Sequence, residues 1–409
     1  MVHMAGEPVR SSAARRFWSP PARFADRPAD RRVTFLELFF DLVFVVVIAQ
    51  LAQRLAAHPS WSGVGWFVFL FYAVWSSWIN GTLYYDLHGT NDVSVRMFTF
   101  LQMLAVAVMA VFVRDVPGDG AFGFALGFAA NTLVLVVLWF RTGWHDPNHR
   151  VASVPYSASY LIAAAVFAAS AATEAPLVYR LWAIALLIEL AGQLVAYRVW
   201  TPPTDQGGAV FAVTSSLIER LDLFVIIVLG EVIVGSVNGM ADLHPISGAG
   251  IVIGLLGMLV AIGLWWIYFD LVSQRSPTST RTQVWLYLHL PLVIAMAAVG
   301  AALLNTVEHS IEPLPADVRW LLVSALAVAV ASIAALTRTL KARRAYVALY
   351  RTVAGALAGS ALAIAAVGLT DWGSRGTLVA MVLLLGLPIA AGLSVWLRHM
   401  DAADLKLDE

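Results

Sequence analysis

The sequence predicts an all-α polytopic integral membrane protein with about twelve transmembrane helices. Of its 409 residues, 60% are hydrophobic and only 13% are charged. Apolar runs of about 20 residues, the length a helix needs to cross about 30 Å of hydrocarbon, recur from one end of the chain to the other. The Lys and Arg residues between these runs are distributed unevenly between the two sides of the expected membrane. Together these observations exclude a soluble globular domain.

The apolar runs define the expected helices. In chain order they cover approximately residues 35–55, 64–85, 96–113, 121–140, 155–173, 178–197, 215–236, 248–270, 284–304, 319–337, 346–369 and 376–397. Small residues four apart let helices approach closely. We expect such contacts at Gly123-x-x-x-Gly127, Gly250-x-x-x-Gly254 and Gly355-x-x-x-Gly359. Packing within the chain is the expected use of these motifs, and a homo-oligomer face is the alternative.

Basic residues indicate the orientation. With twelve spans and a cytoplasmic Met1, all but five of the 26 Lys and Arg residues lie in or beside cytoplasmic segments. The five on the opposite side are Arg54, Arg114, Arg180, Arg319 and Arg375. An excess of Lys and Arg marks cytoplasmic loops. Both termini are therefore predicted to be cytoplasmic.

The segments outside the spans are short and polar. Residues 1–32 carry seven Arg and four Pro but no apolar core, so they are expected to form a disordered basic cytoplasmic tail rather than a signal peptide. Residues 201–207 form a polar cytoplasmic linker, and 401–409 a cytoplasmic C-terminal tail. The chain has no Cys, which excludes disulfides and thiolate chemistry.

A weak internal repeat divides the membrane region. The segment that begins at Asp41 resembles the one that begins at Asp222, and each Asp is followed nine residues later by a polar side chain, Gln50 or Glu231. The next spans end in Tyr84-Tyr85-Asp86 and Tyr268-Phe269-Asp270. Six spans separate the equivalent helices, so the units would have the same orientation. Residues 33–200 and 208–400 are thus predicted to form two parallel six-helix bundles.

Three motifs carry a resemblance to a known family. They are Glu37-Leu-Phe-Phe-Asp41-Leu-Val-Phe, the segment Asn80…Tyr85-Asp86…Asn91-Asp92…Arg96, and Glu219-Arg220-x-x-x-Phe224-x-x-x-x-Leu229-Gly230-Glu231. At this spacing they resemble the bacterial low temperature requirement protein A (LtrA) family over nearly the whole chain. The resemblance implies a multispanning protein of the bacterial inner (cytoplasmic) membrane. It implies no particular biochemical activity.

Acids within the spans are the candidate functional residues. A charged side chain at a helix centre costs roughly 2.5–3.5 kcal/mol on insertion scales, so such residues pair with one another or mark an ion pathway. The candidates for an ion or substrate pathway are Glu37, Asp41, Asp222, Glu231 and Glu189. The candidates for a charge network near the cytoplasmic side are Asp86, Asp92, Arg96, Glu219, Arg220 and Asp270. Polar contacts between helices are expected from Gln50, Asn80, Gln193 and His289.

Two uses of the network acids stay open. Arg96 is expected to reach Asp41, and Arg220 to face Glu37 or Asp270, which would make buried structural pairs. Alternatively, the same residues line a polar cytoplasmic vestibule. Glu231 lies deeper, and nine residues place it on roughly the opposite helix face from Asp222. We expect it either to carry a proton or to hydrogen-bond a neighbouring helix, next to Gly230, where another backbone could approach.

Transport of an ion, a proton or a small solute is the favoured function. A non-transporting membrane scaffold or a lipid-environment or stress-adaptation protein is the first alternative, and an intramembrane enzyme the second. The chain lacks a zinc motif, a phosphate loop and a nucleophile elbow. His145-Asp146-Pro147-Asn148-His149 is interpreted as loop decoration. We therefore expect no enzymatic activity, cofactor, metal or nucleic-acid partner. The expected partners are the lipid bilayer and a transported ion or small solute.

Overall fold

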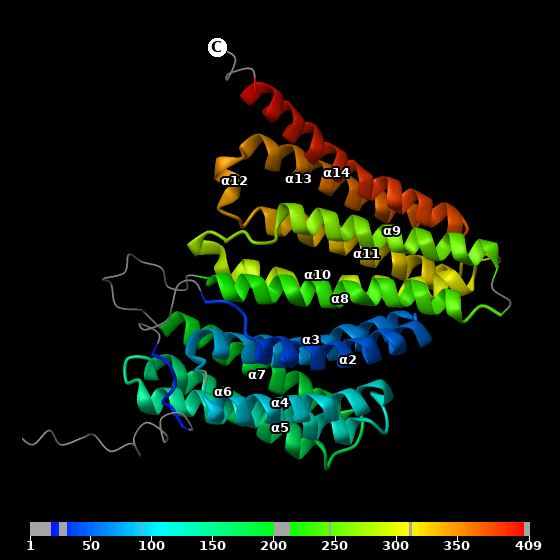
Figure 1. Ribbon diagram of the computed structural model, residues 1–409. Helices are drawn as coiled ribbons and strands as arrows, with labels where there is room; N and C mark the ends of the chain where they lie inside the picture. The colour runs from blue at the N-terminus through cyan, green and yellow to red at the C-terminus, as the bar shows by residue number, and fades with distance from the viewer. Residues whose placement is uncertain are drawn as a thin grey trace, which may run out of the picture. The chain divides into compact units, whose positions relative to one another are not determined.

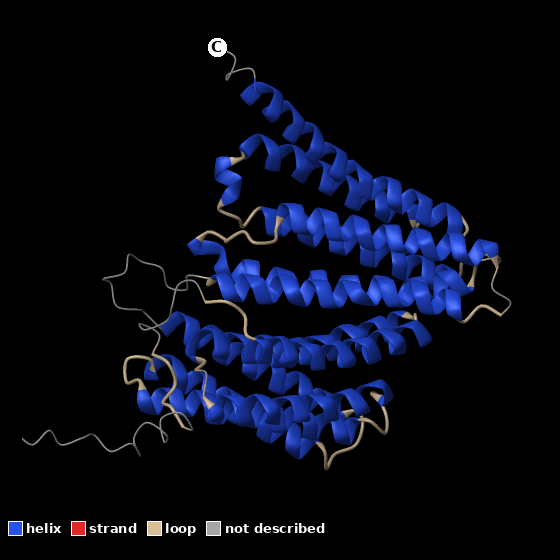
Figure 2. Cartoon of the chain, viewed as in Figure 1, coloured by secondary structure: helices blue, strands red, loops and turns tan. Residues whose placement is uncertain are grey.

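The predicted fold class is confirmed. The computed structural model describes residues 18–23, 31–90, 92–199, 213–244, 247–310 and 313–404. In these ranges twelve helices are long and apolar enough to cross a membrane, and no β-strand is present (Figures 1 and 2). The chain is thus a multi-pass helical membrane protein.

The spanning helices follow the predicted apolar runs in order. They are α2 (Phe35–Ala57), α3 (Trp61–His88), α4 (Val93–Phe112), α5 (Ala121–His145), α6 (Arg150–Ser170), α7 (Leu177–Val199), α8 (Ser215–Ala241), α9 (Gly248–Leu271), α10 (Thr282–Glu308), α11 (Ala316–Thr337), α13 (Val347–Val367) and α14 (Ser374–Asp404). Three short helices, η2 (Val113–Asp115), η4 (Ser279–Arg281) and α12 (Ala342–Ala345), lie between them.

The chain forms two compact units. The first comprises Met1–Val47 and Ala73–Val210, and the second comprises Ile48–Tyr72 and Phe211–Glu409. The end of α2 and the start of α3 therefore group with the second unit, where the Asn305 amide donates to the Ala56 carbonyl at 2.7 Å. The predicted linker 201–207 lies outside the described residues, and the division into two parallel six-helix repeats stays a prediction.

In the first unit, α3 is the helix to which polar contacts converge. Its side chains hydrogen-bond to α2, α4, α5 and α7, through Asp41, Gln102, Thr142 and Glu189 respectively. The remaining helices pack in sequence, α4 on α5, α5 on α6 and α6 on α7. Because a lipid core offers no hydrogen-bond partners, polar residues of spanning helices find them between helices.

In the second unit, the helices close a ring in the order α8, α10, α11, α13, α14, α9 and back to α8. The tightest approach in this ring joins α8 to α10. A methyl group built on Gly235 would lie 2.0 Å from the Gly300 carbonyl oxygen, and one on Gly300 would lie 2.4 Å from the Glu231 carbonyl oxygen. Only glycine allows these two backbones to meet.

The predicted small-residue contacts are met in part. Gly123 and Gly127 face Phe112 and Met109, and Gly250 and Gly254 face Leu243 and Met240, so these motifs serve packing within the chain. By contrast, added methyl groups at Gly355 and Gly359 would meet no described atom within 4 Å. The expected close approach at Gly230 is wrong, because a methyl group there would also meet open space. The close backbone approach on α8 is instead at Gly235, which meets Gly300 of α10.

Both chain ends contribute ordered structure where they are described. Ser19 donates its backbone N–H to the Asp92 carboxylate at 2.6 Å, and the Trp18 ring packs edge-on against Phe98. Residues 18–23, which the sequence placed in a disordered tail, thus contact the first unit. At the other end, α14 extends to Asp404 and includes part of the predicted C-terminal tail.

Candidate intramembrane polar site

The first-unit site centres on Glu189, about midway along α7. Its side chain is 1% exposed. Oε1 accepts a hydrogen bond from Asn80 Nδ2 of α3 at 3.0 Å, whereas Oε2 has no hydrogen-bond partner among the described residues. Leaving a buried polar group unpaired costs roughly 1–3 kcal/mol. This carboxyl group therefore has capacity to take up a proton or a cation.

Further polar atoms are buried on the neighbouring helices. Tyr85 Oη donates to Gln102 Oε1 at 2.8 Å, and Gln102 Nε2 lies 3.4 Å from Asn131 Oδ1. Gly81 lies against Phe40 and Gln102, because a methyl group there would lie 3.2 Å from Phe40 Cζ and 3.4 Å from Gln102 Nε2. Asn80 Oδ1, Asn131 Nδ2 and Thr132 Oγ1 have no hydrogen-bond partner in the described part of the chain. The first unit thus contains several incompletely bonded polar groups.

The motif acids of α2 have specific structural partners. Thr34 and Glu37 form a capping box: the Glu37 carboxylate accepts from Thr34 N at 2.8 Å, and Glu37 N donates to Thr34 Oγ1 at 3.3 Å. Arg31 Nη2 also binds Glu37 at 2.5 Å. Asp41 is fully buried and accepts a hydrogen bond from Trp78 Nε1 at 2.7 Å. These contacts favour structural roles for both acids, and the predicted pairing of Asp41 with Arg96 stays a prediction.

The acids between α3 and α4 are arranged differently from one another. Asp92 is the N-cap of α4, where its Oδ1 accepts from Val95 N at 2.9 Å and from Ser94 Oγ at 2.9 Å. Asp86 is buried near the end of α3, and Arg96 is exposed on α4. Asp92 therefore stabilises a helix start, as acids commonly do.

The second-unit site joins α8, α9 and α10 through Asp222. Tyr268 Oη donates to Asp222 Oδ1 at 2.9 Å and lies 3.1 Å from His289 Nε2. Ser273 Oγ and the backbone N–H of Gln274 donate to Asp222 Oδ2, at 2.7 and 2.9 Å. The side chains of Asp222, Tyr268, Ser273 and His289 are buried, and Gln274 is exposed. His289, predicted as a helix contact, is thus part of a chain of titratable groups.

The hydrogen-bonded side chains of Asp222, Tyr268 and His289 can hold one additional proton, as the number of hydrogen atoms available to them shows. His289 Nδ1 lies 2.8 Å from the Trp285 carbonyl oxygen, which can only accept, so Nδ1 carries the hydrogen. In a neutral imidazole Nε2 is then an acceptor, and so is an ionised Asp222. The single Tyr268 hydroxyl proton cannot serve both acceptors. One more proton, on Asp222 or on His289, would complete both hydrogen bonds.

The remaining predicted residues do not form one cluster. Glu231 is buried, and no described residue donates a hydrogen bond to its carboxyl group. Asp270 and Glu219 are exposed, while Arg220 is buried. Asp270 lies at the exposed end of α9, and the expected contact of Arg220 with Glu37 or Asp270 stays a prediction. Gln50 and Gln193 are half-buried.

His149 was interpreted as loop decoration, and this interpretation is wrong. It is 2% exposed and lies among aromatic rings, 4.5 Å from the His88 ring and 5.9 Å from the Trp139 ring. Burial lowers the pKa of the His149 imidazole from 6.5 to about 4, against the opposing effect of the Asp146 carboxylate. The residue immediately precedes α6, where the positive helix end also disfavours an imidazolium.

This pKa predicts an acid-sensitive stability. Above pH 6.5 His149 is neutral in both the folded and unfolded states. Below it the unfolded state binds a proton that the folded state resists, so stability falls progressively as the pH drops to about 4, by about 3 kcal/mol at most. Thermal unfolding of the detergent-solubilised protein between pH 7 and 4 measures this slope.

Matched histidine variants isolate the effect of His149. His149→Phe keeps an aromatic ring in the cluster and should flatten the slope between pH 6.5 and 4. His145→Gln removes an exposed histidine four residues away and should leave the slope unchanged. An unaltered slope in His149→Phe would assign the acid sensitivity to other groups, among them His88, whose ring lies 4.5 Å from that of His149.

The chain matches a known protein family over most of its length. The model of the family described as bacterial low temperature requirement A protein (LtrA) matches residues 32–387. The chain is also 30% identical over 283 residues to a protein of Rhizobium meliloti (strain 1021) described as "Uncharacterized protein RA0937", and the match covers 66% of this chain and 68% of that protein. The family match includes α3, α7 and α8 with their polar groups.

Proposed function

We propose that this chain, which belongs to the bacterial low temperature requirement A protein (LtrA) family, moves a proton or another ion across the membrane. One observation carries the proposal: the Glu189 carboxyl group is buried midway along a spanning helix, with one oxygen bonded to Asn80 and the other unpartnered among the described residues. Acids in such positions mark ion pathways and proton relays.

The atoms around Glu189 suit a positively charged ligand. Glu189 Oε2 and Asn80 Oδ1 are oxygen atoms without described partners on two hydrogen-bonded side chains, and oxygen ligands suit a hydronium ion or a hard monovalent cation. In a purely structural Glu, a hydrogen bond to the second carboxylate oxygen would add stability. Both carboxylate oxygens accept hydrogen bonds in Glu37 and in Asp222. The unfilled oxygen of Glu189 is therefore consistent with a group that binds and releases a ligand.

The second unit supports the proton form of the proposal. Asp222, Tyr268 and His289 form a connected chain in which one extra proton can be held. Chains of Asp, Glu and His side chains are the usual construction of proton relays in membrane pumps and transporters. Glu231 provides another buried carboxyl group on the same helix as Asp222.

The same proposal includes an orientation. An even number of spans puts both termini on one side of the membrane, and the distribution of Lys and Arg favours the cytoplasm of a bacterial inner membrane. The C-terminal end of α3 and the start of α4 would then face the cytoplasm, and Glu189 would lie near the middle of the bilayer.

A flux assay tests the proposal directly. The purified full chain is reconstituted in liposomes, and the movement of protons, potassium and sodium is measured with and without an imposed potential. We expect one of these ions to move at least tenfold faster than in protein-free liposomes. Rates no faster than in protein-free liposomes for all three ions would overturn the proposal in favour of the scaffold alternative, which the filled hydrogen bonds of Glu37 and Asp41 favour.

A further inference from the structure

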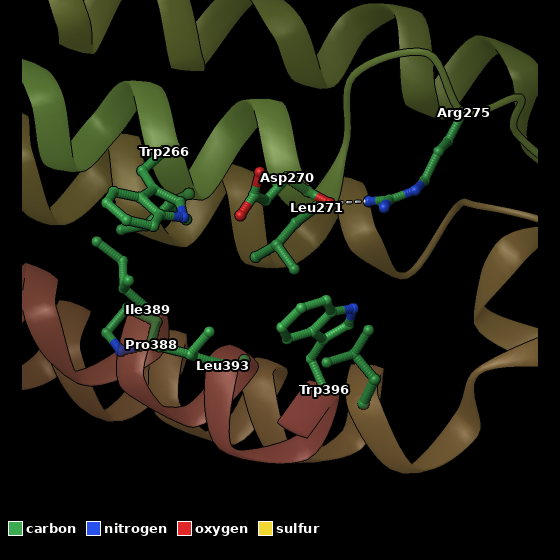
Figure 3. Close-up of a pocket in the computed structure, with 11 residues that line it drawn as sticks. Trp266, Asp270, Leu271, Arg275, Pro388, Ile389, Leu393 and Trp396 are labelled. Atoms are coloured by element: carbon green, nitrogen blue, oxygen red, sulfur yellow. Dashed lines mark hydrogen bonds between the residues drawn. The ribbon is translucent and has the colours of Figure 1, made fainter. Parts of the chain in front are cut away.

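A pocket of about 420 Å³ lies in the second unit between α9, α13 and α14 (Figure 3). Its walls are mainly apolar and aromatic, and Trp266 of α9 faces Ile389 and Leu393 of α14 across the cavity. Trp396 closes the end nearer Arg275. The volume is in the range of small-molecule binding sites, with the apolar lining typical of them.

The pocket has a structural cause in α14. Pro388 has no N–H, so the carbonyl group of Leu384 loses its helical partner. Ser360 Oγ of α13 donates to that carbonyl instead, at 2.8 Å. A proline inside a helix bends it, and α14 diverges from α9 toward its C-terminal end (Figure 1). Pro388 lines the cavity, and the hydrogen bond from Ser360 satisfies the carbonyl group that the proline leaves without its helical partner.

Two opposite charges lie at one end of the pocket. Asp270 is exposed next to the C-terminal residue of α9, where the helix dipole disfavours an acid. Arg275 donates from Nη1 to the Asp270 carbonyl oxygen, and its guanidinium lies 5.9 Å from the Tyr350 ring centroid. The guanidinium is thus fixed beside the pocket, where its remaining donors suit a phosphate.

The position of the pocket along the spanning helices suits a lipid head group. Its residues come from the last turns of α9, the first turn of α13 and the C-terminal half of α14, so they share one end of the spanning helices. The ends of spanning helices mark the boundary of the hydrocarbon, where Trp side chains are enriched. An occupant there has an apolar part among the tryptophans and a charged part at Asp270 and Arg275.

We infer that this pocket binds one phospholipid whose head group carries both a phosphate and an ammonium group, as in phosphatidylethanolamine. The phosphate binds Arg275, the ammonium group binds Asp270, and an acyl chain lies between Trp266 and Leu393. Charge complementarity selects this head group over an anionic one, because Asp270 would repel a lipid that has only a phosphate charge.

Binding is tested with the full chain, delipidated in detergent. Dioctanoyl phosphatidylethanolamine, dioctanoyl phosphatidylglycerol and free phosphoethanolamine are titrated separately, with native mass spectrometry as the readout. We expect one phosphatidylethanolamine per chain, bound at least fivefold more tightly than phosphatidylglycerol, and no saturable binding of phosphoethanolamine. Equal binding of the two lipids, or binding of phosphoethanolamine as tight as that of the lipid, would overturn the inference.

Variants of α14 test the cavity itself. Gly392 lines the pocket, and a methyl group on it would meet only Val353 Cγ2, at 3.7 Å, so Gly392→Leu fills the cavity. It should weaken phosphatidylethanolamine binding at least tenfold. Gly386→Leu is the matched control, because it adds the same side chain to the same helix where no described atom lies within 4 Å. Equal binding by both variants would contradict the assignment.

Charge variants test the head-group contacts without altering the core. Asp270→Asn should abolish the preference for phosphatidylethanolamine over phosphatidylglycerol, and Arg275→Gln should weaken the binding of both lipids at least fivefold. Arg398→Gln removes an exposed charge from α14 outside the pocket and should have no effect. Unchanged lipid preference in Asp270→Asn would overturn the assignment even if Gly392→Leu did not fold.

Discussion

Glu189→Gln is expected to reduce ion flux in proteoliposomes at least tenfold while leaving the protein folded. Glutamine keeps a carbonyl oxygen that can accept the hydrogen bond from Asn80 Nδ2, at present 3.0 Å long. It cannot bind and release a proton, and its amide nitrogen replaces the unpartnered Oε2 by a donor that repels cations. The change therefore separates the chemistry of the carboxyl group from its packing.

The control for this prediction is Glu174→Gln. Glu174 is exposed in the segment just before α7, so the same substitution there should leave the flux unchanged. Size-exclusion chromatography and thermal unfolding establish that both variants are folded. Wild-type flux in Glu189→Gln would remove Glu189 from the pathway. If Glu231→Gln then abolished flux, the buried carboxyl group of α8 would be the ion-binding group.

Hydropathy predicted the helices well because it is a local property. Each span needs only a run of apolar residues of sufficient length, which a single sequence displays directly. Helix ends depend on caps and on tertiary contacts, and these are less visible. The sequence placed residues 401–409 in a tail, for example, whereas α14 continues through Asp404. The GxxxG motifs predicted close contacts, but only the packed structure separates the filled pair Gly123 and Gly127 from the open pair Gly355 and Gly359.

The side-chain partners were predicted less well, because pairing depends on how helices rotate against one another. The sequence did not indicate the hydrogen bond from Trp78 to Asp41, and the expected pairing of Asp41 with Arg96 stays a prediction. The capping box at Glu37 was visible in the local pattern Thr34-x-x-Glu37. Gln102 had no signal beyond being a lone amide in an apolar run. His149 was misjudged because Pro147 argues for a loop but says nothing about burial.

The contacts of Glu189 and Asp222 suggest different roles for the two buried acids. Glu189 has one filled oxygen and one unpartnered oxygen, so its substitution should affect function more than stability. Asp222 has both oxygens filled by donors from α9 and the segment that follows it. Breaking a filled buried network strands its other members, so the largest stability loss is expected at Asp222 rather than at Glu189.

Asp222→Ala is expected to destabilise the protein by about 2–6 kcal/mol, because it strands two buried donors at roughly 1–3 kcal/mol each. These are the hydroxyl groups of Tyr268 and Ser273. The third donor, Gln274 N, belongs to an exposed residue that water can reach, but its backbone has φ of 57°, a left-handed conformation that is unfavourable for a residue with a side chain. Losing the Asp222 contact also releases that backbone.

Thermal unfolding in detergent and the yield of folded protein measure the effect. Asp222→Asn should be intermediate, because its amide keeps an acceptor for Tyr268 but presents a donor toward Ser273 and Gln274. Asp242→Ala is the matched control: Asp242 is the exposed C-cap of α8, where the helix dipole disfavours an acid, so its loss should be neutral or slightly stabilising. If Asp222→Ala unfolded at the same temperature as Asp242→Ala, the Asp222 network would contribute little to stability. Flux measurements on Tyr268→Phe would then test whether its extra proton site serves transport.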